Sequence, residues 1–160
     1  MDAVHASLNQ HAERVWEAVA PGLPGFTVEV LAEIDSTNTE LMRRARTEVL
    51  APTLLVALSQ TAGRGRRGKA WVSAPGDSLT FSLGLPLAPA DWSGLSLAVG
   101  VSLADSLHPE LRLKWPNDLW WAGRKLGGIL VETAHPGTGP ASGRSVVVGV
   151  GLNLATPQLP

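Results

Sequence analysis

The chain has 160 residues, a formal net charge of -1 and no cysteine. Its length predicts one domain, and 44% hydrophobic with 17% charged residues predicts a folded globular protein rather than a disordered one. Without cysteine, disulfides, thiol catalysis and thiolate metal sites are excluded, and the near-neutral charge argues against a general nucleic-acid binder. Residues 1–20 lack the apolar segment of a signal peptide, and no apolar run approaches the length of a membrane span, so we expect a cytoplasmic protein.

Helix and strand signals alternate along the chain. Apolar residues at helical spacing predict an amphipathic helix over residues 3–20, and two Pro-Gly pairs end it. Two more helices are expected over residues 37–49 and 92–107, the second of them largely buried. Strands are expected at residues 26–31, 54–58, 78–85, 111–115, 119–121, 125–132 and 145–154, of which the fifth and sixth form a hairpin.

The order of these elements predicts an α+β protein. Its short hairpins favour a mostly antiparallel or mixed central sheet, with helices packed on one face. No internal repeat or linker divides the chain. We therefore expect a single domain over residues 1–160, made of an N-terminal helical part (1–25) and a core (26–154).

A run of polar residues follows the first strand. Residues 35–39 read Asp-Ser-Thr-Asn-Thr, and Thr37 with Glu40 fits the T-x-x-E capping box. The run is therefore expected to cap the helix that follows. A cap requires only one side chain, so the others are available to contact a ligand. The sequence leaves both interpretations open.

The most distinctive stretch is the basic loop, residues 60–71. It places four cations within residues 64–69 and interleaves them with Gly63, Gly65 and Gly68. Glycine costs backbone entropy and neighbouring like charges repel, so neither a helix nor a strand is favoured here. We expect a mobile loop that wraps an anion, since arginine forks and free backbone N–H groups both bind carboxylate or phosphate. A solvated basic turn and an RNA-binding Arg-Gly segment are the alternatives.

The three lysines of the chain each lie at a motif. Lys69 is in the basic loop, Lys114 precedes a Pro-Asn-Asp bend, and Lys125 stands at the mouth of the hairpin. Lys114 and Asp118 flank the bend, where we expect either an ion pair between them or a contact from Asp118 to Mg²⁺ or a ribose hydroxyl.

No catalytic nucleophile is evident in the sequence. There is no G-x-S-x-G motif, no Walker motif and no histidine near a candidate serine. What remains is a site of cations, amides and glycines. Such a site favours phosphoryl or acyl-phosphate chemistry by electrostatic stabilisation, without a covalent enzyme intermediate.

Five segments together resemble the biotin protein ligases. They occur in the order and approximate spacing of that family, at residues 35–38, 60–68 with Trp71, 114–118, 125–132 and 149–153. The related lipoate ligases share the fold but not the Gly-Arg-Gly-Arg-Arg-Gly loop, so they are the weaker match. The resemblance implies the fold common to biotin ligases and class II aminoacyl-tRNA synthetases.

The resemblance also implies a two-step reaction with assigned residues. Biotin and MgATP give biotinyl-5′-AMP, and the acyl group then passes to a lysine of a biotin carboxyl carrier domain. Lys125 and Arg66 are the implied catalytic residues. The residues implied to bind biotin are Ser36, Thr37, Asn38, Gln60, Arg64, Gly65, Arg66 and Lys125. Those implied to bind ATP or the adenylate are Arg66, Trp71, Lys114, Asp118 and Asn153, with Asp118 also as the metal ligand.

Fuller members of this family carry an N-terminal winged helix-turn-helix domain and a small C-terminal β-barrel. These 160 residues contain neither, so we expect no DNA binding and no membrane association, whereas the resemblance allows a homodimer. Two other hypotheses stay open. One is a non-catalytic module that binds biotin or its adenylate, and the other is a lipoate ligase-like enzyme. Formation of biotinyl-AMP distinguishes the ligase from both.

Overall fold

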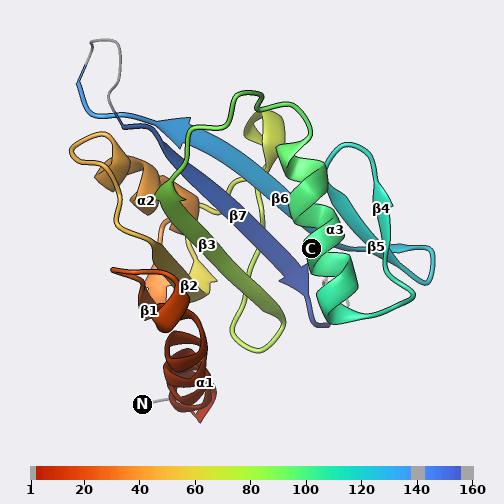
Figure 1. Ribbon diagram of the computed structural model, residues 1–160. Helices are drawn as coiled ribbons and strands as arrows, with labels where there is room; N and C mark the ends of the chain where they lie inside the picture. The colour runs from red at the N-terminus through yellow and green to blue at the C-terminus, as the bar shows by residue number, and fades with distance from the viewer. Residues whose placement is uncertain (1–2, 138–142, 156–160) are drawn as a thin grey trace.

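A computed structural model describes residues 3–137 and 143–155. Seven strands form one sheet in the order β1-β2-β3-β7-β6-β5-β4 (Figure 1). The strands are β1 (Thr27–Ile34), β2 (Thr53–Gln60), β3 (Ser78–Pro86), β4 (Arg112–Lys114), β5 (Asp118–Trp121), β6 (Arg124–Ala134) and β7 (Ser145–Asn153). The helices are α1 (Ala3–Val19), α2 (Thr37–Ala45) and α3 (Leu95–Leu107), with 3-10 turns η1 (Ala20–Gly22) and η2 (Arg66–Gly68).

The sheet is mixed. β1 and β2 are parallel, as a crossover through α2 requires, and the other described pairs are antiparallel. The predicted α+β class, the mostly antiparallel mixed sheet and the β5–β6 hairpin are therefore confirmed.

The helices lie on both faces of the sheet, so the prediction that they pack on one face is wrong. Val147 of β7 lies in a core cluster with Leu41 of α2. Its neighbours Val146 and Val148 lie in a second cluster, against which Leu95 of α3 packs. Successive side chains of a strand point to opposite faces. Because β7 is apolar at consecutive positions, it needs a cover on each side.

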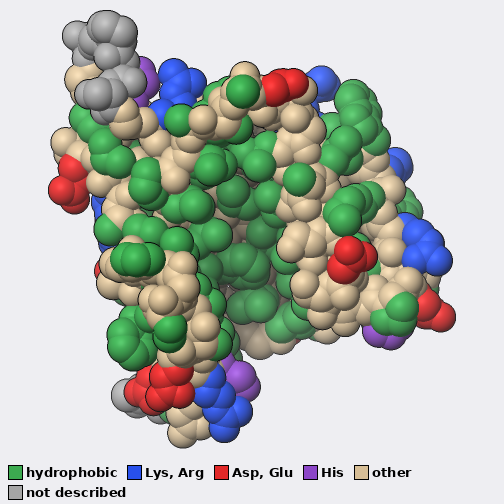
Figure 2. Space-filling view, in the orientation of Figure 1, with side chains coloured by type: hydrophobic (Ala, Val, Ile, Leu, Met, Phe, Trp, Pro, Cys, Tyr) green, Lys and Arg blue, Asp and Glu red, His purple; other side chains and the backbone are tan. Residues whose placement is uncertain are grey.

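One face of β3 is polar and yet buried. Thr80, Ser82 and Gly84 are buried on the α2 side, whereas the alternating apolar residues Phe81 and Leu83 are only half-buried. Because α3 contacts β4, β5 and β6, it leaves β3 largely uncovered. Figure 2 shows the resulting hollow of hydrophobic side chains beside α3. The polar face of β3 is buried because α2 packs on it, with Thr37 and Asn38 in contact with Ser82.

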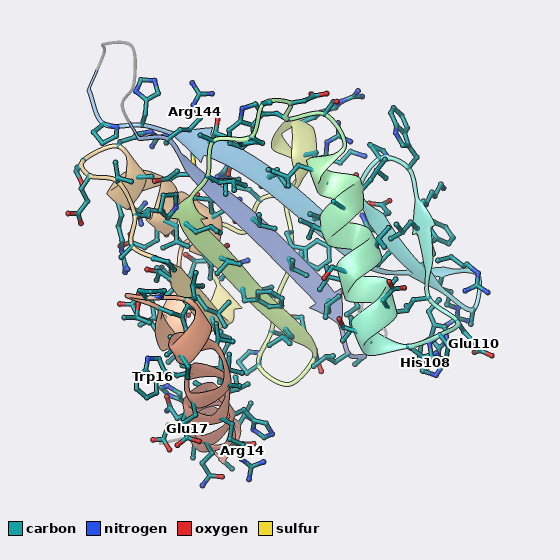
Figure 3. The ribbon with its side chains drawn as sticks, in the orientation of Figure 1. Arg14, Trp16, Glu17, His108, Glu110 and Arg144 are labelled. Atoms are coloured by element: carbon teal, nitrogen blue, oxygen red, sulfur yellow. The ribbon has the colours of Figure 1, made fainter. Side chains whose placement is uncertain are left out.

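The helix expected over residues 3–20 is confirmed as α1, and the other two helix predictions need adjustment. α1 has no buried residue and packs on β1 at the sheet edge, where the Trp16 indole donates a 3.0 Å hydrogen bond to the Phe26 carbonyl (Figure 3). α2 ends at Ala45 rather than at residue 49, because the Thr47 hydroxyl bonds the Arg44 carbonyl at 2.9 Å. α3 begins at Leu95 and only its Gly100 is buried, so it is not the largely buried helix expected.

No helix in the described part of the chain is long and apolar enough to cross a membrane.

Candidate active site

A cleft of about 430 Å³ lies on the α2 side of the sheet. Its volume is in the range of sites for small molecules. Ten of the twelve predicted site residues line it: Ser36, Thr37, Asn38, Gln60, Arg64, Gly65, Arg66, Trp71, Asp118 and Lys125. Among its lining side chains are five cations (Arg64, Arg66, Arg67, Lys69 and Lys125) and a single carboxylate, that of Asp118. The cleft is therefore suited to an anionic ligand.

Glycines on β6 and β7 give the cleft its depth. A side chain at Gly149 would collide with the Asn38 amide, and one at Gly151 would collide with the Trp71 indole. A Cβ at Gly128 would lie 3.8 Å from the Lys125 amine. Gly149 and Gly151 thus leave room for predicted site residues, whereas a Cβ at Gly128 would be in ordinary contact with Lys125.

The N-terminus of α2 supplies the polar wall of the cleft. The Ser36 hydroxyl caps the helix by accepting a 3.3 Å hydrogen bond from the Thr39 amide. The Asp35 carboxylate accepts a 2.7 Å hydrogen bond from the Ser36 amide and forms an ion pair with Arg43 at 2.8 Å. Capping therefore uses Ser36, while Asp35 fixes the start of the helix and does not line the cleft.

Asp35→Asn is expected to lower stability only at neutral pH. The hydrogen bond from Arg43 is the largest cause that holds the pKa of the Asp35 carboxyl below its usual value of 3.8. The stabilisation of the folded state by ionised Asp35 is therefore fully present above pH 3.8. It is lost as the pH falls through the lower pKa that Asp35 has in the folded protein. Because the pair is exposed, the difference should be at most about 1 kcal/mol. Urea unfolding at pH 7 and below pH 3 measures it, and a difference that persists in acid would contradict this role.

Thr37, Asn38 and Gln60 belong to one buried hydrogen-bond network. The Thr37 amide and hydroxyl donate to Gln60 Oε1 at 2.8 and 3.2 Å. The Ser82 hydroxyl lies 2.7 Å from the Thr37 hydroxyl and 2.5 Å from Asn38 Oδ1. Asn38 Nδ2 donates to the Leu130 carbonyl at 3.2 Å. These side chains are held in fixed orientations at the cleft wall, beyond any need for capping.

Gly149→Ala is expected to disrupt this network. The new methyl group would overlap the Asn38 amide, which hydrogen bonds hold in place on both of its ends. We therefore expect the free energy of unfolding to fall by roughly 1–3 kcal/mol. Gly22→Ala is the matched control, because nothing lies within 4 Å of a methyl group there. Denaturant unfolding of both variants tests the expectation, and equal stability would show that the Asn38 amide moves freely.

The basic loop joins β2 to β3, as predicted, and is folded as a short hairpin. Arg64 and Ala70 form an isolated antiparallel bridge, and the Gly65 amide donates to the Lys69 carbonyl at 2.7 Å. At the tip, Arg67 has a left-handed φ of 54°. The guanidinium of Arg66 reaches across the cleft to Asn117 Oδ1 at 3.4 Å.

Lys125 projects from the start of β6 into the cleft. Its amine lies 3.3 Å from the Asp118 carboxylate and 5.9 Å from the centre of the Trp71 ring. The predicted ion pair of Asp118 with Lys114 is not formed, because the Lys114 amine instead lies over the Trp120 ring at 4.4 Å. Lys125, Asp118 and Trp71 thus form one corner of the cleft.

Lys114 and Asn153 lie outside the cleft lining. Lys114 pairs with Asp118 only through the backbone register of β4 and β5. Asn153 ends β7, opposite Ser78 of β3. The structure therefore does not bring these two predicted site residues to the others.

The metal prediction rests on Asp118 alone. The described residues contain no group of three or more His, Asp or Glu side chains that could hold a metal ion. His108 lies beyond the end of α3, where its ring is tilted against that of Trp121 with the ring centres 5.4 Å apart (Figure 3). A single carboxylate fits Mg²⁺ that arrives with a nucleotide, because Mg²⁺ commonly takes one or two carboxylates and completes its shell with phosphates and water.

Sequence reasoning gave no role to three residues that shape the site. Ser82 bridges Thr37 and Asn38, Asn117 accepts from Arg66, and Glu132 accepts from Asn38 and Arg64. The sequence did contain a signal for Ser82, because it shares the polar face of β3 with Thr80. Asn117 and Glu132 both lie inside segments that had been singled out as motifs.

The fold and the cleft define an α+β domain with a cleft lined by cations and polar groups. The chain belongs to the biotin/lipoate A/B protein ligase family, whose model matches residues 30–153. It is 43% identical over 139 residues to the Escherichia coli bifunctional ligase/repressor BirA, covering 83% of this chain and 42% of BirA.

Two solved structures have the same fold. Biotin acetyl coenzyme A carboxylase synthetase from Helicobacter pylori, with bound biotinylated ATP, has a TM-score of 0.66 and 30% identity, over 83% of this chain and 63% of that one. Biotin protein ligase from Aquifex aeolicus, in complex with biotin and ATP, has a TM-score of 0.65 and 33% identity, over 83% and 54%. The chain thus spans about half the length of these relatives.

Proposed function

We propose that the cleft binds biotin and MgATP and joins them as biotinyl-5′-AMP. The acyl group then passes to a lysine of a biotin carboxyl carrier domain in the cytoplasm, where ATP is available. The observation that carries the proposal is the pairing of two surfaces in one cleft: a fixed polar network beside a cluster of five cations with one carboxylate. The first suits the uncharged polar head of biotin, and the second suits its carboxylate and the phosphates of ATP.

In the first step the biotin carboxylate attacks the α-phosphorus of ATP and pyrophosphate leaves. Both reactants are anionic, so they approach only if cations neutralise them. We assign Lys125 to the biotin carboxylate and the α-phosphate, because its amine lies in the cleft beside Gly128, at the corner shared with Asp118 and Trp71. We propose that the basic loop acts as a lid over the adenylate, and we assign Arg66 of its tip to cover the adenylate. No covalent enzyme intermediate is needed, and alignment with charge stabilisation provides the rate.

The remaining assignments follow the two ends of the ligand. Ser36, Thr37, Asn38 and Gln60 would hydrogen-bond the biotin head, with Arg64 and Gly65 at the stem of the lid. Trp71 would border the adenine, and Asp118 would face Mg²⁺ bound to the phosphates. Direct ATP contacts of Lys114 and Asn153 stay predictions, since both lie outside the cleft lining.

Calorimetric titration with biotin and with lipoate tests the ligand class. We expect biotin to bind and to raise the melting temperature, and lipoate to do neither at the same concentration. Binding of lipoate in preference to biotin would replace the proposal with the lipoate ligase-like alternative. Binding of biotin without turnover of MgATP would leave the non-catalytic module.

A further inference from the structure

Glu132 lies on β6 behind the cleft and holds two of its walls. It points to the α2 side of the sheet, four residues after Gly128 on the same strand face. Glu132 Oε1 accepts a 3.0 Å hydrogen bond from Asn38 Nδ2 and a 2.7 Å bond from Arg64 Nη2. Arg64 Nη1 reaches the second oxygen at 3.3 Å. One carboxylate, which does not line the cleft, therefore joins α2 to the basic loop.

The contact with Asn38 fixes which way its amide points. An ionised carboxylate only accepts hydrogen bonds, so it selects the NH₂ end of the amide. The oxygen end is then left for Ser82, whose hydroxyl lies 2.5 Å from Asn38 Oδ1. Ser82 in turn contacts the Thr37 hydroxyl at 2.7 Å. Glu132 thus terminates the hydrogen-bond chain that orients the proposed contacts to the biotin head.

The contact with Arg64 fixes the stem of the basic loop. Three guanidinium nitrogens are engaged, two by Glu132 and the third by the Thr39 hydroxyl at 2.9 Å. The charge of Arg64 is therefore already compensated inside the protein. Arg64 also pairs through its backbone with Ala70, so the anchor restrains both arms of the hairpin. The carboxylate partner of Arg64 thus lies behind the cleft, whereas Asp118, the partner of Lys125, lies in the cleft lining itself.

We propose that Glu132 is a positioning residue that pre-organises the cleft without touching the ligand. The proposal rests on the proposed function, because Glu132 holds the Asn38 amide that would face the biotin head. Glu132 also holds Arg64 at the stem of the basic loop, whose tip carries Arg66. Groups held in their bound arrangement lose less freedom when the ligand arrives. Loss of Glu132 should therefore weaken biotin binding and also loosen the empty loop.

Two measurements on Glu132→Ala test this role. Biotin should bind at least roughly tenfold more weakly, as expected for lost hydrogen bonds to a charged group. In the protein without biotin, trypsin should cut faster after residues 66, 67 and 69 of the loop. Glu132→Gln, which keeps the shape and one acceptor oxygen, should restore part of both. Arg64→Ala combined with Glu132→Ala should weaken binding less than the sum of the single variants, because the pair acts as a unit.

Glu29→Ala is the matched control, because Glu29 pairs with Arg44 at 2.7 Å and does not line the cleft. It should leave the biotin affinity and the rate of loop cleavage as in the parent protein. Unchanged affinity and unchanged loop cleavage in Glu132→Ala would overturn the positioning role. If the parent protein itself fails to bind biotin, the proposed function is wrong, and the cleavage rate of the empty loop alone then decides the role of Glu132.

Discussion

Lys125→Ala should lower the rate of biotinyl-AMP formation by roughly 10²–10³-fold, as expected when one charge-stabilising group is removed from an active site. Lys125 is the cation that lies against the bare strand position Gly128, at the corner shared with Asp118 and Trp71. Its side chain is 45% exposed, so the free energy of unfolding should change by no more than about 0.5 kcal/mol. Pyrophosphate release in a single turnover gives the rate, and denaturant unfolding gives the stability.

Arg124→Ala is the control for this prediction. Arg124 immediately precedes Lys125 on β6, is exposed and does not line the cleft, so its loss should leave adenylate formation nearly unchanged. If Lys125→Ala lost stability in proportion to activity, the lysine would be structural, through its pair with Asp118. A similar rate for both variants would remove Lys125 from the proposed chemistry.

Arg66→Ala should leave the fold intact and release the adenylate at least roughly tenfold faster, the effect of losing a charge-assisted hydrogen bond. Its guanidinium already spans the cleft to Asn117, in the position of a lid that excludes water from a reactive mixed anhydride. Retention of preformed biotinyl-AMP after removal of free ligand measures the release. Arg46→Ala, at the end of α2 and away from the cleft, is the control. Equal retention in both variants would rule out the lid role.

Short sequence patterns predicted the elements whose formation depends on neighbouring residues. The helix start after Asp35, the β5–β6 hairpin and the basic loop between two strands each follow from a few neighbouring residues. The cap itself is Ser36 rather than the expected Thr37–Glu40 box. The position of α3 on the opposite face does not, because the consecutive apolar residues of β7 fit a strand that is covered on either side or on both. Which helix covers which face of β7 depends on how the whole helices pack against the sheet.

The site shows the same division between local and tertiary information. The sequence placed Arg64 and Lys125 in a cationic cleft, but it did not show that Glu132, 68 residues further along, compensates the first of them. Lys114 and Asp118 flank the Pro-Asn-Asp bend, which was the reason to expect an ion pair, and they are indeed opposite one another in the register of β4 and β5. In the structure, Lys114 lies over the Trp120 ring and Asp118 pairs with Lys125 instead. These partners depend on distances that only the folded sheet determines.

Mass spectrometry of the chain mixed with biotin and MgATP, without any acceptor protein, tests the central claim most directly. Formation of biotinyl-AMP with release of pyrophosphate is the predicted result, and it should fall sharply in Lys125→Ala. A folded chain that yields no biotinyl-AMP, and whose melting temperature biotin does not raise, would contradict the account of the cleft.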